Sequence, residues 1–193
     1  MMDNRDNLDV WIADLDSRDP EVRYSAIKRL EAMGTEAVES LIVTMQNQTG
    51  RKAWEAVSIL SHIDDSRWMQ PMKDMLTESN TMIATLAASA LERFGTDIVD
   101  VFIDALPKCR CLAQMQIIII LERIGDERCT LPLMDLLLST DSCDLQHTVI
   151  HALGILGDGR AIELIRTFQN HENHHVRKRA QATLKQLEDK INE

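Results

Sequence analysis

The stretch that decides the fold is residues 145–168, which read LQHTVIHALGILGDGRAIELIRTF. Apolar residues recur at helical spacing on both sides of the corner Gly157-Asp158-Gly159. They are Val149, Leu153 and Leu156 before the corner and Ala161, Leu164 and Ile165 after it. Glycine supplies the left-handed backbone that ends one helix, and an aspartate side chain can cap the next. The stretch therefore predicts a helix–turn–helix hairpin.

Similar corners recur along the chain, about 31 residues apart, which indicates a helical repeat. These corners are Met33-Gly34, Ile63-Asp64, Phe94-Gly95, Ile124-Gly125 and Leu156-Gly157. Three of them continue as Asp-x-Arg, and we expect the side chains of Asp126 and Asp158 to cap the helices that follow.

The repeat predicts an all-α protein, an α-solenoid (superhelix) of about six helix pairs in a single domain, residues 1–193. First helices are expected near residues 6–16, 35–47, 66–78, 96–107, 127–139 and 159–169. Second helices are expected near residues 20–33, 50–63, 80–94, 110–124, 142–156 and 172–190. Composition agrees, because 45% hydrophobic residues with only 4% aromatics suit helix packing better than sheets.

The charge and cysteine content narrow the classes of partner and compartment. A formal net charge of −10 repels phosphate, so we expect neither nucleic-acid nor membrane binding. The acidic start MMDNRDNLDV does not resemble a signal peptide, and the four cysteines lack the spacing of a disulfide framework. We therefore expect a cytoplasmic protein with reduced thiols.

The repeats resemble a known family. Asp19-Pro20-Glu21-Val22-Arg23, followed by Ala26, Leu30 and Gly34, is similar to the HEAT-repeat signature. The Gly-Asp-x-Arg-Ala corner of residues 157–161 resembles the phycobilisome-lyase-type HEAT-like repeat. This resemblance implies that the second helix of each pair lines the concave surface.

With that register, the predicted partner-binding residues face solvent from the second helices. They are Tyr24, Trp54, Met82, Thr85, Leu112, Met115, Ile119, His147 and His151. The middle of this row is apolar, and three interpretations are open: packing between neighbouring second helices, a groove for a partner, or a hydrophobic small-molecule site.

Two clusters could also hold a metal ion. Cys109, Cys111 and Cys143 open two second helices along one edge, as a soft-metal or iron–sulfur site would require. His147 and His151 are four residues apart on one helix, but no third ligand follows at a definite spacing. We therefore predict no bound metal and no cofactor. The single pair His171-Glu172 is similar to those of deoxyhypusine hydroxylase, a HEAT-repeat iron enzyme, whose family needs several such pairs.

The sequence contains no glycine-rich phosphate loop, nucleophile elbow or acid–base pair, which favours a function other than catalysis. The leading hypothesis is a scaffold or adaptor that binds a protein partner on its concave face. The resemblance also implies an alternative, a bilin lyase-like or chromophore-handling factor, with a bilin near His147 and His151. A metal or iron–sulfur assembly factor is the weaker alternative.

Overall fold

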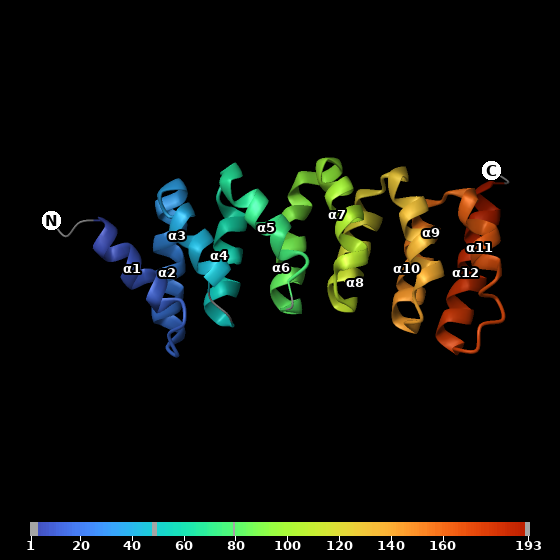
Figure 1. Ribbon diagram of the computed structural model, residues 1–193, viewed down its shortest axis with the longest axis horizontal. Coiled ribbons are helices and arrows are strands. Elements are labelled where there is room, and N and C mark those ends of the chain that lie inside the picture. Colours follow the sequence, from blue (N-terminus) through green and yellow to red (C-terminus); the bar gives the residue numbers. More distant parts are fainter. Residues whose placement is uncertain (1–3, 48–49, 79, 192–193) are drawn as a thin grey trace. The chain divides into compact units, whose positions relative to one another are not determined.

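The computed structural model describes residues 4–47, 50–78 and 80–191 (Figure 1). All regular elements in these ranges are helices and none is a strand, which confirms the predicted all-α class. The chain divides into two compact units, Met1–Arg93 and Phe94–Glu193, and each is described by itself below. That residues 1–193 act as one domain stays a prediction.

Unit 1 contains three helix pairs. Its α-helices are α1 (Asn4–Asp14), α2 (Pro20–Met33), α3 (Val38–Asn47), α4 (Arg51–His62), α5 (Met69–Met75) and α6 (Thr81–Leu91). The short 3-10 turns η1 (Gly34–Glu36) and η2 (Ser66–Trp68) lead into α3 and α5. Helix α4 packs against α2 and α6, so the second helices stack side by side as in an α-solenoid.

Unit 2 repeats this arrangement. Its α-helices are α7 (Val99–Ala105), α8 (Cys111–Ile124), α9 (Thr130–Ser139), α10 (Cys143–Leu156), α11 (Ile162–Arg166) and α12 (His174–Ile191). Its 3-10 turns are η4 (Leu106–Lys108), η5 (Glu127–Cys129) and η6 (Gly159–Ala161), while η3 (Glu92–Ile98) contains the boundary between the units. Helix α10 packs between α8 and α12, which again stacks the second helices.

The corners follow from the sequence as predicted. Gly125 and Gly157 adopt left-handed backbone, with φ of 71° and 77°, where a side chain would be strained. Asp126 and Asp158 then accept hydrogen bonds at 2.9 Å from the backbone N–H groups of Arg128 and Arg160. Both predicted caps are confirmed.

The first helices are shorter than predicted. The segment expected near 159–169, for example, has only the α-helix α11 (Ile162–Arg166), preceded by η6. The first turn after the corner aspartate is 3-10 rather than α-helical, as is frequent at the ends of α-helices. The apolar period does not distinguish this turn from the start of an α-helix.

The core of each unit lies between its first and second helices. In unit 1 the largest fully buried side chains include Trp68, whose indole N–H donates to the Ile63 carbonyl at 3.0 Å. In unit 2 they include Phe102, and Ile117, Ile118 and Ile120 are also fully buried. The faces of the second helices that do not carry these buried residues remain as the candidate site.

Candidate functional site

The unit 1 part of the predicted row lies on α2, α4 and α6 and is accessible. Tyr24 and Trp54 are exposed, and Met82 exposes 66% of its surface. Thr85 is half-buried, and its hydroxyl donates to the Thr81 carbonyl at 2.7 Å. Three large side chains that could contact a partner thus remain uncovered on three neighbouring helices of this unit.

The unit 2 part of the row begins on α8. Leu112 exposes 64% of its surface, Ile119 is partly exposed, and Met115 is half-buried. The sequence of α8 is apolar on almost every side, yet Leu112 and Ile119 of this helix are not covered. Packing between neighbouring second helices accounts for Met115 in part, but it leaves Leu112 open.

The two histidines of the row form a polar network with Arg179 of α12. The Arg179 Nε donates to His147 Nε2 at 3.2 Å, and its Nη1 lies 3.4 Å from His151 Nδ1. His151 Nε2 also lies 3.8 Å from a carboxylate oxygen of Glu122. Burial and the positive charge of Arg179 lower the pKa of His147. A neutral His147 is the form that accepts this hydrogen bond.

The network was missed by the sequence interpretation, although a signal existed. Arg179 lies 32 residues after His147 and 28 after His151, so it occupies a neighbouring position one repeat later. In this arrangement the guanidinium engages one ring nitrogen of each histidine, which a metal ion could then not use. The geometry therefore favours histidines that hold α10 to α12 over a two-histidine metal site.

The cysteines expected along one edge differ in their surroundings. Cys109 is buried, and burial raises the pKa of its thiol to about 11, whereas Cys111 is exposed and Cys143 is half-buried. The Cys111 Sγ lies 3.9 Å from the Ser142 hydroxyl. Among the described residues, no group of three or more His, Cys, Asp or Glu side chains is arranged to hold a metal ion.

In the Asp-x-Arg corners, the arginine side chain links neighbouring first helices. In unit 1, Arg67 binds Asp65 and reaches back to the Glu39 carboxylate at 3.0 Å and the Thr35 carbonyl at 2.8 Å. The same geometry recurs in unit 2. There Arg128 binds Asp126, the Asp100 carboxylate at 2.8 Å and the Thr96 carbonyl at 3.0 Å. Since these groups bind one another, the corner motif serves packing rather than chemistry.

The third corner makes weaker contact with the preceding repeat. Arg160 binds Asp158 and lowers the pKa of this carboxyl to about 2, but within the described residues Arg160 has no recorded hydrogen bond to an earlier repeat and is attracted there by the charge of Glu127. The acids that pair with Arg67 and Arg128 lie 28 residues before them, and Pro132 occupies the corresponding position before Arg160. A proline side chain cannot form the ion pair.

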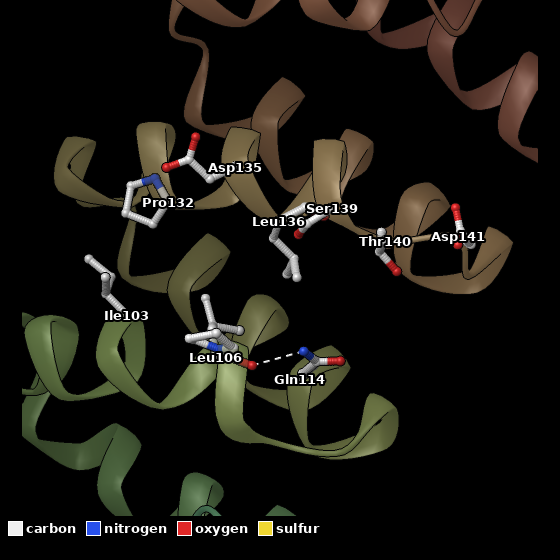
Figure 2. Close-up of a pocket in the computed structure, with 10 residues that line it drawn as sticks. Ile103, Leu106, Gln114, Pro132, Asp135, Leu136, Ser139, Thr140 and Asp141 are labelled. Carbon is white, nitrogen blue, oxygen red and sulfur yellow. Dashed lines mark hydrogen bonds between the residues drawn. The ribbon is translucent and has the colours of Figure 1, made fainter.

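A groove of about 580 Å³ lies between the first helices α7 and α9 of unit 2 (Figure 2). Its lining residues are Ile103, Leu106, Pro107, Gln114, Pro132, Asp135, Leu136, Ser139, Thr140 and Asp141. Figure 2 shows Asp135 beside Pro132 and Asp141 beyond Thr140, with Leu136 between these two acids and Ile103 on the far side of Asp135. A volume of this size is within the range of ligand sites in proteins.

The sequence did not predict this groove, because all the predicted partner-binding residues belong to second helices. A partial signal was the composition of segment 130–139, TLPLMDLLLS, which holds more apolar residues than one buried stripe requires. In the structure Leu131 and Leu138 of this helix are exposed, and Leu136 is half-buried in the groove.

Comparison with known proteins supports the repeat assignment. A family model for HEAT repeats matches residues 99–185, which include α8 and α10 and most of α12. Residues 99–185 are therefore similar to HEAT repeats. The match supports a HEAT-repeat protein and does not resolve the subfamily. No curated protein sequence matches the chain.

Two solved structures are similar. Human deoxyhypusine hydroxylase in complex with glycerol has a TM-score of 0.54 and 13% identity, covering 97% of this chain and 98% of that one. An engineered protein has a TM-score of 0.49 and 18% identity, covering 95% and 97%. At this identity the likeness to the hydroxylase shows a shared HEAT-type fold and nothing about activity. Among the described residues, no helix combines the length and apolar character needed to cross a membrane.

Proposed function

We propose that the protein is a non-catalytic HEAT-repeat scaffold that binds a protein partner through the exposed face of its second helices. The observation that carries this proposal is the set of large apolar side chains left open on that face. Met82 in unit 1 and Leu112 in unit 2 each expose about two thirds of their surface. In unit 1, Met82 is accompanied by the exposed Tyr24 and Trp54 on neighbouring second helices, and grouped exposed apolar residues are typical of interaction sites.

The residues around these two anchors support the same function. In unit 1 the exposed aromatic side chains Tyr24 and Trp54 belong to the residue types that dominate binding energy at interfaces. In unit 2 the half-buried Met115 has a flexible, polarisable side chain that adapts to a partner surface. The row offers contact area without a group of catalytic residues.

The chromophore-handling alternative has less support. It derives from the Gly-Asp-x-Arg corner, and the arginine of one such corner, Arg128, is bound to Asp side chains and a backbone carbonyl of the chain. His147, a residue that would contact a bilin, is hydrogen-bonded to Arg179. An absorbance shift on mixing the protein with a bilin would support this alternative. Loss of that shift in a His147→Gln variant would support it further.

The scaffold proposal is tested by charge substitutions with matched controls. Met82→Glu and Leu112→Glu place a carboxylate on the second-helix face. Val43→Glu in α3 and Leu138→Glu in α9 place it at equally exposed apolar positions on first helices. We expect the first pair to lose a partner captured from the source cells and the second pair to retain it. Equal capture by all four variants would refute the proposed surface.

Met115→Glu separates a binding role from a packing role at the centre of the row. If Met115 contacts a partner, the variant keeps its melting temperature and loses binding. If Met115 is a core residue, a buried unpaired carboxylate lowers the free energy of unfolding by several kcal/mol. A collapse in melting temperature would therefore remove Met115 from the site.

A further inference from the structure

We propose that the groove between α7 and α9 is a second docking site, and that it binds a partner segment in which apolar side chains are flanked by lysine or arginine. This site lies on the first helices of unit 2, apart from the second-helix face considered above. The chemistry of the residues that line the groove determines which occupant it fits.

The middle of the groove is apolar. Ile103 and Leu106 line it from one side, and Pro132 and Leu136 line it from the other (Figure 2). The ring of Pro107 adds further apolar surface, and neither proline has a backbone N–H to offer a ligand. This part of the groove suits a branched aliphatic side chain.

Two of the polar donors of the lining are already used within the chain. The Gln114 amide nitrogen donates to the Leu106 carbonyl at 2.8 Å, and the Ser139 hydroxyl donates to the Leu136 carbonyl at 3.2 Å. The Thr140 hydroxyl oxygen accepts from the backbone N–H of Ser142 at 3.2 Å. These contacts stabilise the helix ends around the groove and leave few donors for a ligand.

The acceptors of the lining remain available. Asp135 and Asp141 are exposed, and no hydrogen bond or ion pair of either carboxylate is recorded within the described residues. The ten lining residues include these two acids and no basic side chain. A surface that is rich in acceptors and poor in donors selects a ligand that brings donors, and the charges select a cation.

The arrangement of the two acids suggests how a ligand would lie. Asp135 and Asp141 stand apart with Leu136 between them, so one cationic group cannot serve both while filling the space between them (Figure 2). A peptide with a basic residue at each end of an apolar pair satisfies both carboxylates. The formal net charge of −10 adds long-range attraction for such a segment.

Fluorescein-labelled Arg-Leu-Leu-Arg amide, added to the full chain and followed by fluorescence anisotropy, tests the proposal. We expect saturable binding that weakens with added salt, because the ion pairs are exposed. The peptides Glu-Leu-Leu-Glu and Arg-Ser-Ser-Arg should bind much more weakly, since each lacks one half of the match. No saturable binding of Arg-Leu-Leu-Arg at millimolar concentration would overturn the proposal.

Variants of the chain locate the binding. Asp135→Asn with Asp141→Asn should weaken the affinity about three- to tenfold, the effect of losing two exposed ion pairs. Asp9→Asn with Asp16→Asn changes two exposed acids in unit 1, alters the net charge equally and should leave the affinity unchanged. Equal weakening by both pairs would mean that net charge attracts the peptide, and the groove would be refuted.

A second copy of the chain is the competing occupant. If the chain sediments as a dimer that Leu136→Gln converts to a monomer, the groove is a self-association surface and the proposal fails. Met82→Glu, the substitution used to test the scaffold function, should bind Arg-Leu-Leu-Arg as the unaltered chain does. The two proposals can therefore fail independently.

Discussion

Replacing Gly154 with alanine tests how closely α10 and α12 pack. A Cβ atom added at Gly154 would lie 2.7 Å from the Thr183 Cγ2 atom, well inside van der Waals contact. Thr183 is 2% exposed, and its hydroxyl lies 3.4 Å from the Ile150 carbonyl, so it has little freedom to move. The Gln186 side chain also donates to the Gly154 carbonyl at 3.0 Å.

Two opposing effects set the magnitude. Alanine is better than glycine inside a helix by about 1 kcal/mol. Overpacking a closed core costs about 1–3 kcal/mol. Taking about 2 kcal/mol for the overpacking, we expect Gly154→Ala to lower the free energy of unfolding by about 1 kcal/mol. The sign of the change distinguishes a close helix contact from simple helix propensity.

A double-mutant cycle isolates the contact. Thr183→Ser removes the methyl group that meets the new Cβ and keeps the hydroxyl, at a cost of about 1 kcal/mol for one buried methyl. In the double variant the alanine methyl fills the vacated space, so stability should match or exceed that of the unaltered chain. The expected coupling is about 2 kcal/mol, well above the additive limit.

The assay is urea unfolding followed by far-ultraviolet circular dichroism. Fluorescence would not report on this contact directly, because Trp11, Trp54 and Trp68 all belong to unit 1. If Gly154→Ala raises the urea midpoint, or if the two substitutions are additive, the close approach of α10 and α12 is wrong.

Four further expectations concern charge, thiols and cooperativity. Asp158→Ala should lower the free energy of unfolding by about 1 kcal/mol, and Asp158→Asn, which still caps the helix, should lower it less. Because the pKa of the Asp158 carboxyl is lower in the folded state, the stability advantage of Asp over Asn should be complete above about pH 4 and fade toward pH 2. Equal melting temperatures of all three proteins at pH 7 would contradict the cap. Since the pKa of His147 is lowered in the folded state, the contribution of His147 to stability is complete above about pH 6.5, and stability falls as the pH drops below that value. His147→Gln should remove this part of the pH dependence of the melting temperature. An unchanged pH profile in this variant would show that His147 does not cause the dependence. N-ethylmaleimide should modify Cys111 first and spare Cys109 and Cys129, whose buried thiols have pKa values near 11, as mass spectrometry of digests can check; early modification of either buried thiol would show that its packing is wrong. If residues 1–193 form one domain, tryptophan fluorescence from unit 1 and circular dichroism from the whole chain should give the same urea midpoint, whereas two separate transitions would show independent units.

The helix pattern was predictable because a 3.6-residue period and a repeat of about 31 residues are properties of the sequence itself. Helix α2 (Pro20–Met33) has the expected limits, and α8 (Cys111–Ile124) and α10 (Cys143–Leu156) begin one residue later than expected. Helix α6 ends at Leu91, short of the expected 94, because the 3-10 stretch η3 follows it. Helix ends depend on local hydrogen bonds that apolar spacing does not record.

The site was less predictable for a different reason. Register correctly places Met82 and Leu112 on open faces, but it does not tell which half-buried residues a neighbouring helix covers, as with Met115. The groove between α7 and α9 depends on how two first helices from adjacent repeats are spaced. That spacing comes from side-chain packing across the repeats, and single-chain periodicity carries no information about it.

Pro132 links the groove to the repeat that surrounds it. In the two corners whose arginine binds an acid of the preceding repeat, that acid stands 28 residues before the arginine: Glu39 before Arg67 and Asp100 before Arg128. Proline cannot form that ion pair, so Arg160 has no acidic partner at this position. The ring of Pro132 instead forms part of the apolar wall of the groove. Because an exposed ion pair is worth little, a repeat can lose it at small cost in stability. The apolar wall of the groove and the missing ion pair of Arg160 therefore have one structural cause, Pro132. This residue lies on the first helix α9 and not on the second-helix face that the family resemblance implies as the binding surface.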